Sequence, residues 1–228
     1  MTATVDWEAV GLSVELAGIV TAILLLGGLP LAWWLTFRRR RWTFLVESIV
    51  ALPLVLPPTV LGFYVLVAIG SRSPIGRAWE TLTGHGLAFT FEALVVASIL
   101  YSLPFVVQPI AAAFSQVDPA LLEASTTLGA SGWRTFTRIV VPLCRDGILA
   151  AAVLGFAHTL GEFGVVLMVG GNLPGVTRTV SIAIYDHVQA FEYGAANRTA
   201  LLLLGFSFAA LATVYGLLRR PWNVRPHA

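Results

Sequence analysis

The chain has 228 residues, of which 57% are hydrophobic and only 11% are charged, and its formal net charge is +2. Soluble domains carry about 25% charged residues, so this composition excludes an ordinary soluble protein and indicates an integral membrane protein. The small net charge and the lack of a basic tract give no sign of a nucleic-acid partner. All fourteen basic residues are arginine, so the chain lacks the lysine that a Walker A phosphate-binding loop requires.

Five hydrophobic stretches predict a single all-α membrane domain over residues 1–228. Residues 1–9 contain no basic residue, so they lack the positive region of a cleavable signal peptide, and the first span is expected to be retained. Cys144 is the only cysteine, which excludes an internal disulfide, and the sequence predicts no metal site, no cofactor and no catalytic residue. The predicted spans are about 10–37, 44–70, 87–114, 148–169 and 200–218.

The distribution of arginine predicts the orientation of these spans. Positively charged flanks are retained on the cytoplasmic side of a membrane. With the N-terminus outside, ten arginines lie inside and four outside, so we expect an external N-terminus, a cytoplasmic C-terminus and a cytoplasmic 118–142 segment. The inner set is Arg38, Arg39, Arg40, Arg41, Arg134, Arg138, Arg145, Arg219, Arg220 and Arg225, and the outer set is Arg72, Arg77, Arg178 and Arg198.

The 118–142 segment is predicted to form two short helices separated by a glycine. Asp118 followed by Pro119 is typical of a helix N-cap and first helical residue. Gly129 is expected to end this first helix, and Ser131 to cap a second one. Pro142 is expected to stop the second helix.

The same segment resembles the EAA loop of binding-protein-dependent ABC importer permeases. Glu123, Ala124, Gly129, Ile139 and Pro142 match its residues and spacing. Two positions depart from the pattern, because Ser125 stands where alanine is usual and Val141 where leucine is usual. The resemblance implies a type I ABC importer architecture in which these helices seat in a groove of a separate ATPase subunit. The coupling residues that it implies are Glu123, Ala124, Ser125, Gly129, Ala130, Ile139 and Pro142.

Prolines inside the second and third spans predict a translocation pathway. Prolines at these depths free backbone hydrogen-bonding groups, which is tolerated only where protein or a water-filled cavity satisfies them. Neutral hydroxyl and amide donors nearby suit an oxyanion that must bind weakly. The alternative is that both helices are kinked and only pack against each other. The residues predicted to line the pathway are Pro57, Pro58, Thr59, Ser98, Ser102 and Gln108.

Carboxylates in the spans are interpreted as structural. Glu15, Glu92 and Glu162 lie toward the outer ends of their spans, where the interface or pairing with an outer arginine explains them. His158 and Glu162 are four residues apart and share a helix face. A structural hydrogen bond is favoured there over a proton relay.

Three further stretches are similar to molybdate permeases, with tungstate and sulfate permeases as alternatives. They are LPLVLPPTVLGFY at 52–64, GEFG at 161–164 and SIAIYDHVQ at 181–189. The loop 170–197 is too short to span again, so its apolar part is expected to form a helix on the outer surface or one that dips back into the protein. The resemblance implies two ATPase copies, a periplasmic or lipid-anchored oxyanion-binding protein and a second copy of this chain. Whether the ATPase has a regulatory domain stays open.

Two other classes of membrane protein, intramembrane proteases and secondary transporters, share single features with this sequence. Residues 129–132 spell GxSG, the nucleophile motif of rhomboid intramembrane proteases, with His158 as a conceivable base. Ser131, however, lies in a polar loop and not within a span. A secondary transporter would need an ion-coupling site in the membrane and usually two repeated halves, and no internal repeat is visible.

Overall fold

The computed structural model describes residues 5–37 and 41–217, and the regular secondary structure of this part of the chain is all helical, without strands. Three helices are long and apolar enough to cross a membrane: α1 (Trp7–Phe37), α5 (Phe91–Phe114) and α12 (Tyr193–Leu217). The count rises to five if each of two bent helix pairs is one span. Six of the arginines used for the orientation lie outside the described residues: Arg38, Arg39, Arg40, Arg219, Arg220 and Arg225.

The predicted second span is broken. It consists of α2 (Thr43–Ala51), the turn η1 (Leu52–Leu54) and α3 (Pro58–Ile69), and the chain bends by 111° between Leu54 and Pro58. The prolines explain the break: Pro57 has an extended backbone, as expected before another proline, and neither Pro57 nor Pro58 can donate to a preceding turn.

The predicted fourth span is also interrupted. It consists of α9 (Arg145–Leu160) and α10 (Gly164–Gly170), with Gly161–Phe163 between them. At its other end α9 meets the short helices of the 118–142 segment at a bend of 76°. The predicted span over 148–169 therefore consists of two helices, joined by a turn that begins at Gly161 and ends before Gly164.

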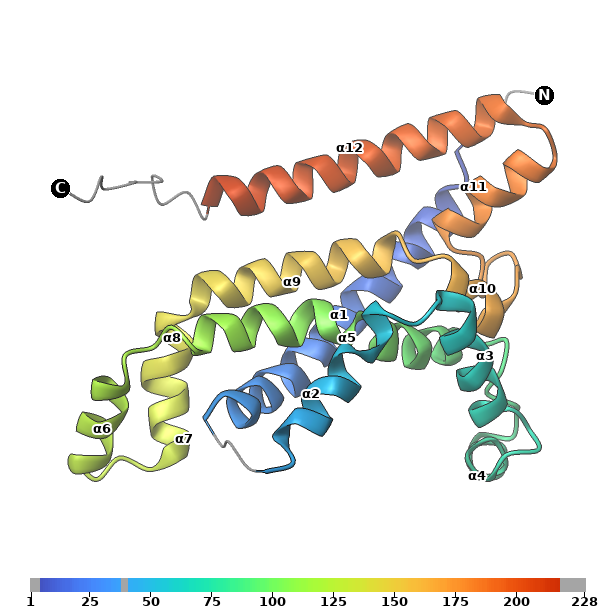
Figure 1. Ribbon diagram of the computed structural model, residues 1–228. Helices are drawn as coiled ribbons and strands as arrows, with labels where there is room; N and C mark the ends of the chain where they lie inside the picture. Colours follow the sequence, from blue (N-terminus) through green and yellow to red (C-terminus); the bar gives the residue numbers. More distant parts are fainter. Residues whose placement is uncertain (1–4, 38–40, 218–228) are drawn as a thin grey trace.

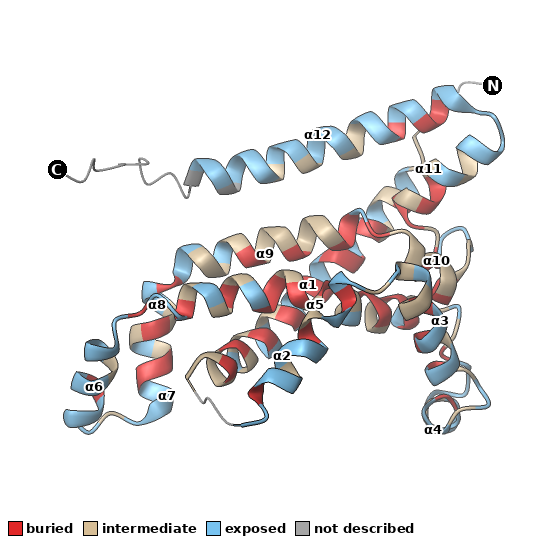
Figure 2. Ribbon diagram, viewed as in Figure 1, coloured by how far each residue is buried: buried red, intermediate tan, exposed pale blue. Residues whose placement is uncertain are grey.

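Helix α5 lies at the centre of the bundle and contacts α1, α9, α10 and the broken second span (Figure 1). Buried residues follow both α1 and α5 (Figure 2). The approach to α9 is very close, since a Cβ at Gly155 would lie 2.5 Å from a methyl carbon of Val106. Small residues of this kind let helix backbones pack closely in a membrane. We infer that α1, α5 and α9 form the rigid centre of the chain.

The predicted helix in the loop 170–197 is confirmed as α11 (Val180–Gln189), and a further short helix, α4 (Pro74–Thr83), follows α3. Arg178 links the loop before α11 to α11 itself, because its Nε donates to Asn172 at 2.6 Å and its Nη2 donates to Asp186 at 3.1 Å. The backbone N–H of Val180 donates to Ser13 of α1 at 2.7 Å. Helix α12 packs on α9 and α11 at the edge of the bundle and is largely exposed (Figures 1 and 2).

Candidate functional site

Local capping builds the first helix of the 118–142 segment, α6 (Pro119–Thr127). The Asp118 carboxylate accepts from the backbone N–H of Ala120 at 2.9 Å, which confirms the predicted N-cap. In the second helix, α7 (Gly132–Thr135), Ser131 accepts from the N–H of Arg134 at 3.3 Å. Both helices therefore begin where the sequence predicts.

The joint between the two helices depends on Gly129. Its φ of +72° lies in the left-handed region, which glycine adopts without strain. Two hydrogen bonds close the end of α6: Gly129 donates to the carbonyl of Thr126 at 2.9 Å and Ala130 to that of Ser125 at 3.0 Å. This pair of bonds is the Schellman pattern. The joint thus satisfies carbonyls that a helix end leaves free.

Ser125, which departs from the family pattern, holds the two helices together. Its hydroxyl shares a hydrogen bond of 2.6 Å with the hydroxyl of Thr135, and both side chains are buried. The usual alanine could not form this bond. The departure therefore adds a specific contact between the two arms.

The second arm does not stop at Pro142 as predicted. It continues as a π-helical turn, η2 (Phe136–Val140), and then as α8 (Val141–Leu143). Pro142 lies in α8 directly after the π-helical turn, so the helix passes through the proline before it ends. The arm ends at Cys144, whose thiol contacts the carbonyl oxygen of Ala113 at 3.4 Å. Burial raises the pKa of this thiol, so it is a weak nucleophile at neutral pH.

Aromatic side chains connect the second arm to the bundle. Phe136 is buried, and its ring centroid lies 5.3 Å from that of Trp33 on α1 and 6.2 Å from that of Phe114 on α5. Trp33 also contacts Phe37 at 4.5 Å, and Phe136 contacts Trp133 at 5.4 Å. Contacts of this geometry stabilise beyond the area that they bury. We refer to these five residues as the aromatic cluster.

The free surface of the segment carries large apolar side chains beside charged ones. Leu128 is 86% exposed and Trp133 is 71% exposed, and Glu123 and Arg134 are exposed as well. Apolar residues exposed together on a polar segment mark an interaction site. Of the other predicted coupling residues, Ala124 and Pro142 are exposed and Ala130 and Ile139 are half-buried.

The structure separates the predicted pathway residues into two groups. Pro57 and Thr59 are exposed at the break of the second span, with Pro58 half-buried beside them. Ser98 and Ser102, in contrast, are fully buried between α5 and the neighbouring helices. Their predicted lining role would require those helices to part.

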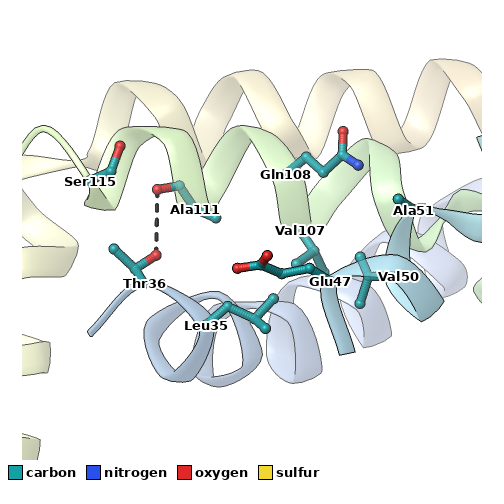
Figure 3. A pocket seen from close by; sticks show the side chains of 9 residues that line it. All are labelled: Leu35, Thr36, Glu47, Val50, Ala51, Val107, Gln108, Ala111 and Ser115. Carbon is teal, nitrogen blue, oxygen red and sulfur yellow. Dashed lines mark hydrogen bonds between the residues drawn. The ribbon is translucent and has the colours of Figure 1, made fainter. Parts of the chain in front are cut away.

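Gln108 lines a pocket of about 370 Å³ between α1, α2 and α5 (Figure 3). The hydroxyl of Thr36 lies 3.5 Å from the carbonyl oxygen of Ala111 at its wall. The carboxylate of Glu47 adds negative charge, which disfavours resting binding of an oxyanion there. The lining residues are Leu35, Thr36, Glu47, Val50, Ala51, Val107, Gln108, Ala111 and Ser115.

A polar cluster between α5 and α9 corrects the interpretation of the buried carboxylate. His158 bonds to the Ser102 hydroxyl at 3.0 Å, and Ser102 bonds to Thr159 at 2.9 Å. His158 therefore makes a structural hydrogen bond, but Glu162 is not its partner. Glu162 is only 4% exposed, and neither of its carboxylate oxygens has a hydrogen-bond partner in the described part of the chain. Pairing of Glu162 with an outer arginine, one of the two explanations that the sequence left open, is not found among these residues.

Comparison with known proteins assigns the chain to a protein family. Residues 26–220 match the family described as binding-protein-dependent transport system inner membrane component. The chain is 52% identical over 214 residues to the molybdenum transport system permease protein ModB of Azotobacter vinelandii, covering 94% of this chain and 95% of that one. It is 32% identical over 193 residues to the sulfate transport system permease protein CysT of Escherichia coli, covering 85% and 69%.

A solved structure agrees with the family in fold. A chain of the bacterial alginate ABC transporter, in complex with an alginate-bound periplasmic protein, superposes with a TM-score of 0.74 at 18% identity. The superposition covers 93% of this chain and 78% of the other. The chain therefore belongs to the family of binding-protein-dependent transport system inner membrane components, and it has the all-helical fold of ABC importer permeases.

Proposed function

We propose that this chain is the permease subunit of an ABC importer that carries molybdate across the inner membrane. The observation that carries the proposal is the 52% identity over nearly the whole chain to a molybdenum transport permease. The sulfate permease is more distant at 32%. Family membership makes the chain a multi-pass transport subunit and not itself an enzyme, so ATP hydrolysis is assigned to a separate ATPase. Tungstate, an oxyanion of like shape and charge, is the alternative substrate.

The ATPase is proposed to dock on the 118–142 segment. Glu123, Leu128, Trp133 and Arg134 offer a mixed apolar and charged surface on two rigidly joined helices. ATP binding would bring two ATPase subunits together, and each segment would follow as a rigid body. A periplasmic or lipid-anchored binding protein is proposed to deliver the oxyanion from outside. The coupling residues stay those that the EAA resemblance implies.

A second copy of the chain is proposed to complete the pathway around the break of the second span. Val55 is 83% exposed there, and the carbonyls of Pro53 and Leu54 lose their helical donors because Pro57 and Pro58 have no N–H. Irregular backbone is not found facing lipid at membrane depth. This face is therefore assigned to a protein partner or a water-filled pathway, and a two-fold dimer provides both.

Five spans with the N-terminus outside are proposed, and reporter fusions test this topology. A reporter fused after Ala228 is expected to be active only as a cytoplasmic marker, and one inserted at Gly84 only as an exported marker. The reason is the excess of arginine on the inner side, since positive flanks are retained in the cytoplasm. The opposite pattern would remove the 118–142 segment from the ATPase side and contradict the docking proposal.

Uptake by reconstituted complexes tests the substrate. Vesicles that contain this permease, an ATPase and a binding protein from the same organism are expected to import radioactive molybdate only when ATP is supplied. Excess tungstate should compete, whereas sulfate should not, because the greater similarity is to the molybdenum permease. Vesicles without ATP are the control. Import of sulfate with no import of molybdate would replace the assignment with the sulfate alternative.

A further inference from the structure

Glu162 is a buried acid without a counter-charge. It lies in the turn between α9 and α10, and both of its oxygens are unpartnered in the described chain. No ion pair joins it to a basic side chain there. An ionised carboxylate is retained at membrane depth only with a charge partner or several hydrogen-bond donors. The described structure supplies neither, so something that it does not contain must neutralise the group.

The groups that face Glu162 do not provide the missing charge. On α5, Ser98 is fully buried with an unpartnered hydroxyl, and Tyr101, whose ring centroid lies 5.0 Å from that of His158, is a phenol and not a cation. On α9, the ring of His158 is held between the Ser102 hydroxyl and the ring of Phe105, whose centroid is 3.7 Å away.

The remaining packed elements place no basic side chain in an ion pair with Glu162 among the described residues: His187 on α11 bonds to Glu192 at 2.9 Å, and Arg198 is the basic residue of α12, which packs on α9. On α3 the titratable side chain is Tyr64, which is exposed, and on α11 Tyr185 contacts Phe163, at 5.0 Å between centroids. On α1, which packs on α9 and α5, the membrane carboxylate Glu15 is exposed. The Ser98 hydroxyl is unpartnered in the described part of the chain, so its oxygen is free to accept a hydrogen bond from a proton on Glu162.

The position of Glu162 connects it to both broken spans. Gly164, two residues later, approaches Pro58 so closely that a Cβ would lie 2.9 Å from the proline Cβ. The break in the fourth span thus rests directly on the break in the second. Relative motion of α3 and α10 would open this contact and admit water to the turn that holds Glu162.

We propose that Glu162 binds a proton in the present conformation and releases it to water when the two broken spans separate. The O–H bond of the carboxyl breaks, the proton passes to water, and the hydrated carboxylate remains. While protonated, the carboxyl can donate to the Ser98 oxygen. Glu162 holds the proton only while the two broken spans are in contact. Acidic pH therefore favours the conformation with the spans in contact, and alkaline pH favours their separation.

Infrared spectroscopy of the purified permease in lipid bilayers tests the proton directly. At neutral pH we expect a C=O band of a protonated carboxyl that shifts when glutamate is labelled with carbon-13. The band should vanish in Glu162→Gln and persist in Glu15→Gln, where the carboxylate is exposed. The Ser98→Ala variant should move the band toward the position of an unbonded acid.

Two infrared results would overturn the proposal, and neither depends on the transported substrate. One is the absence of any labelled protonated-carboxyl band in the wild type, which requires no variant to fold. The other is a band that stays unchanged in Glu162→Gln. Failure of molybdate uptake alone would contradict the proposed function and leave this inference standing.

The pH profile of ATP-driven uptake tests the conformational part, which rests on the proposed function. A single proton can change the balance of two states by up to about tenfold per pH unit. The wild type is expected to show this dependence and Glu162→Gln to lose it. His158→Gln is the matched control, because it removes a titratable side chain of the same helix and leaves Glu162 in place, so the profile should stay. Equal profiles for the wild type and Glu162→Gln would overturn the coupling.

Discussion

Replacing Gly129 with valine is expected to weaken ATPase docking by roughly 5- to 30-fold while the membrane helices still insert. The φ of +72° at this joint costs a residue with a Cβ about 1–2 kcal/mol, and a β-branched residue tolerates it worst. No atom lies within 4 Å of the added Cβ, so the cost is conformational and not a collision. A penalty of this size on the docking geometry changes an equilibrium by about the stated factor. Co-purification of the ATPase at graded concentrations measures it.

Gly132→Val is the matched control for that substitution. Gly132 lies three residues away in the same segment, also has open space around its Cβ position, and has no positive φ. It should therefore retain docking within a few-fold of the wild type. If Gly129→Val docks as well as Gly132→Val, the left-handed joint does not set the geometry of the segment.

The joint could be predicted because its determinants are local in sequence. Asp118, Ser131 and Gly129 each satisfy backbone groups within a few residues of themselves, so their chemistry alone fixes where α6 ends and α7 begins. The helix end near Pro142, in contrast, depends on packing. The π-helical turn before it shifts the hydrogen-bond register, and that shift follows from packing of Phe136 and Val140 against the bundle. Packing of that kind has no signature in residue spacing.

The broken spans show a second limit. The prolines of the second span predict a break, but the angle of 111° depends on how α3 packs against α10. The sequence of the fourth span does contain a signal for its break, because the turn begins at Gly161 and ends before Gly164. The burial of Ser98 and Glu162 could not be foreseen, because hydropathy does not distinguish a side chain that faces a pathway from one enclosed by neighbouring helices.

The aromatic cluster explains how movement of the 118–142 segment could reach the membrane helices. Phe136 touches both α1 and α5, by way of Trp33 and Phe114. Phe114 is fully buried and belongs to the helix at the centre of the bundle. Close-packed interiors transmit displacement because they contain little free space. A displacement of α7 would therefore be transmitted through Phe136 directly to α1 and α5.

Phe136→Ala is expected to separate ATP hydrolysis from transport. Removing a buried phenylalanine costs about 3–5 kcal/mol and leaves a cavity where the segment meets α1 and α5. The exposed docking residues are untouched, so the ATPase should still bind and hydrolyse ATP. Losing a coupling free energy of about 1–3 kcal/mol would lower the molybdate imported per ATP by roughly five- to 150-fold. Phe136→Leu, which fills more of the space, should give an intermediate value and covers the possibility that the alanine variant does not fold.

Trp133→Ala is the comparison variant for Phe136→Ala. Trp133 is a neighbour of Phe136 in the same cluster, but its side chain is 71% exposed on the surface proposed to meet the ATPase. Its loss should weaken docking, and with it hydrolysis and uptake together, so the ratio of molybdate to ATP should stay near the wild-type value. Simultaneous measurement of ATPase binding, hydrolysis and uptake in vesicles distinguishes the two residues. If both Phe136 variants fold and import molybdate at the wild-type ratio, the displacement must enter the bundle elsewhere, through the connection of α8 to α9 at Cys144.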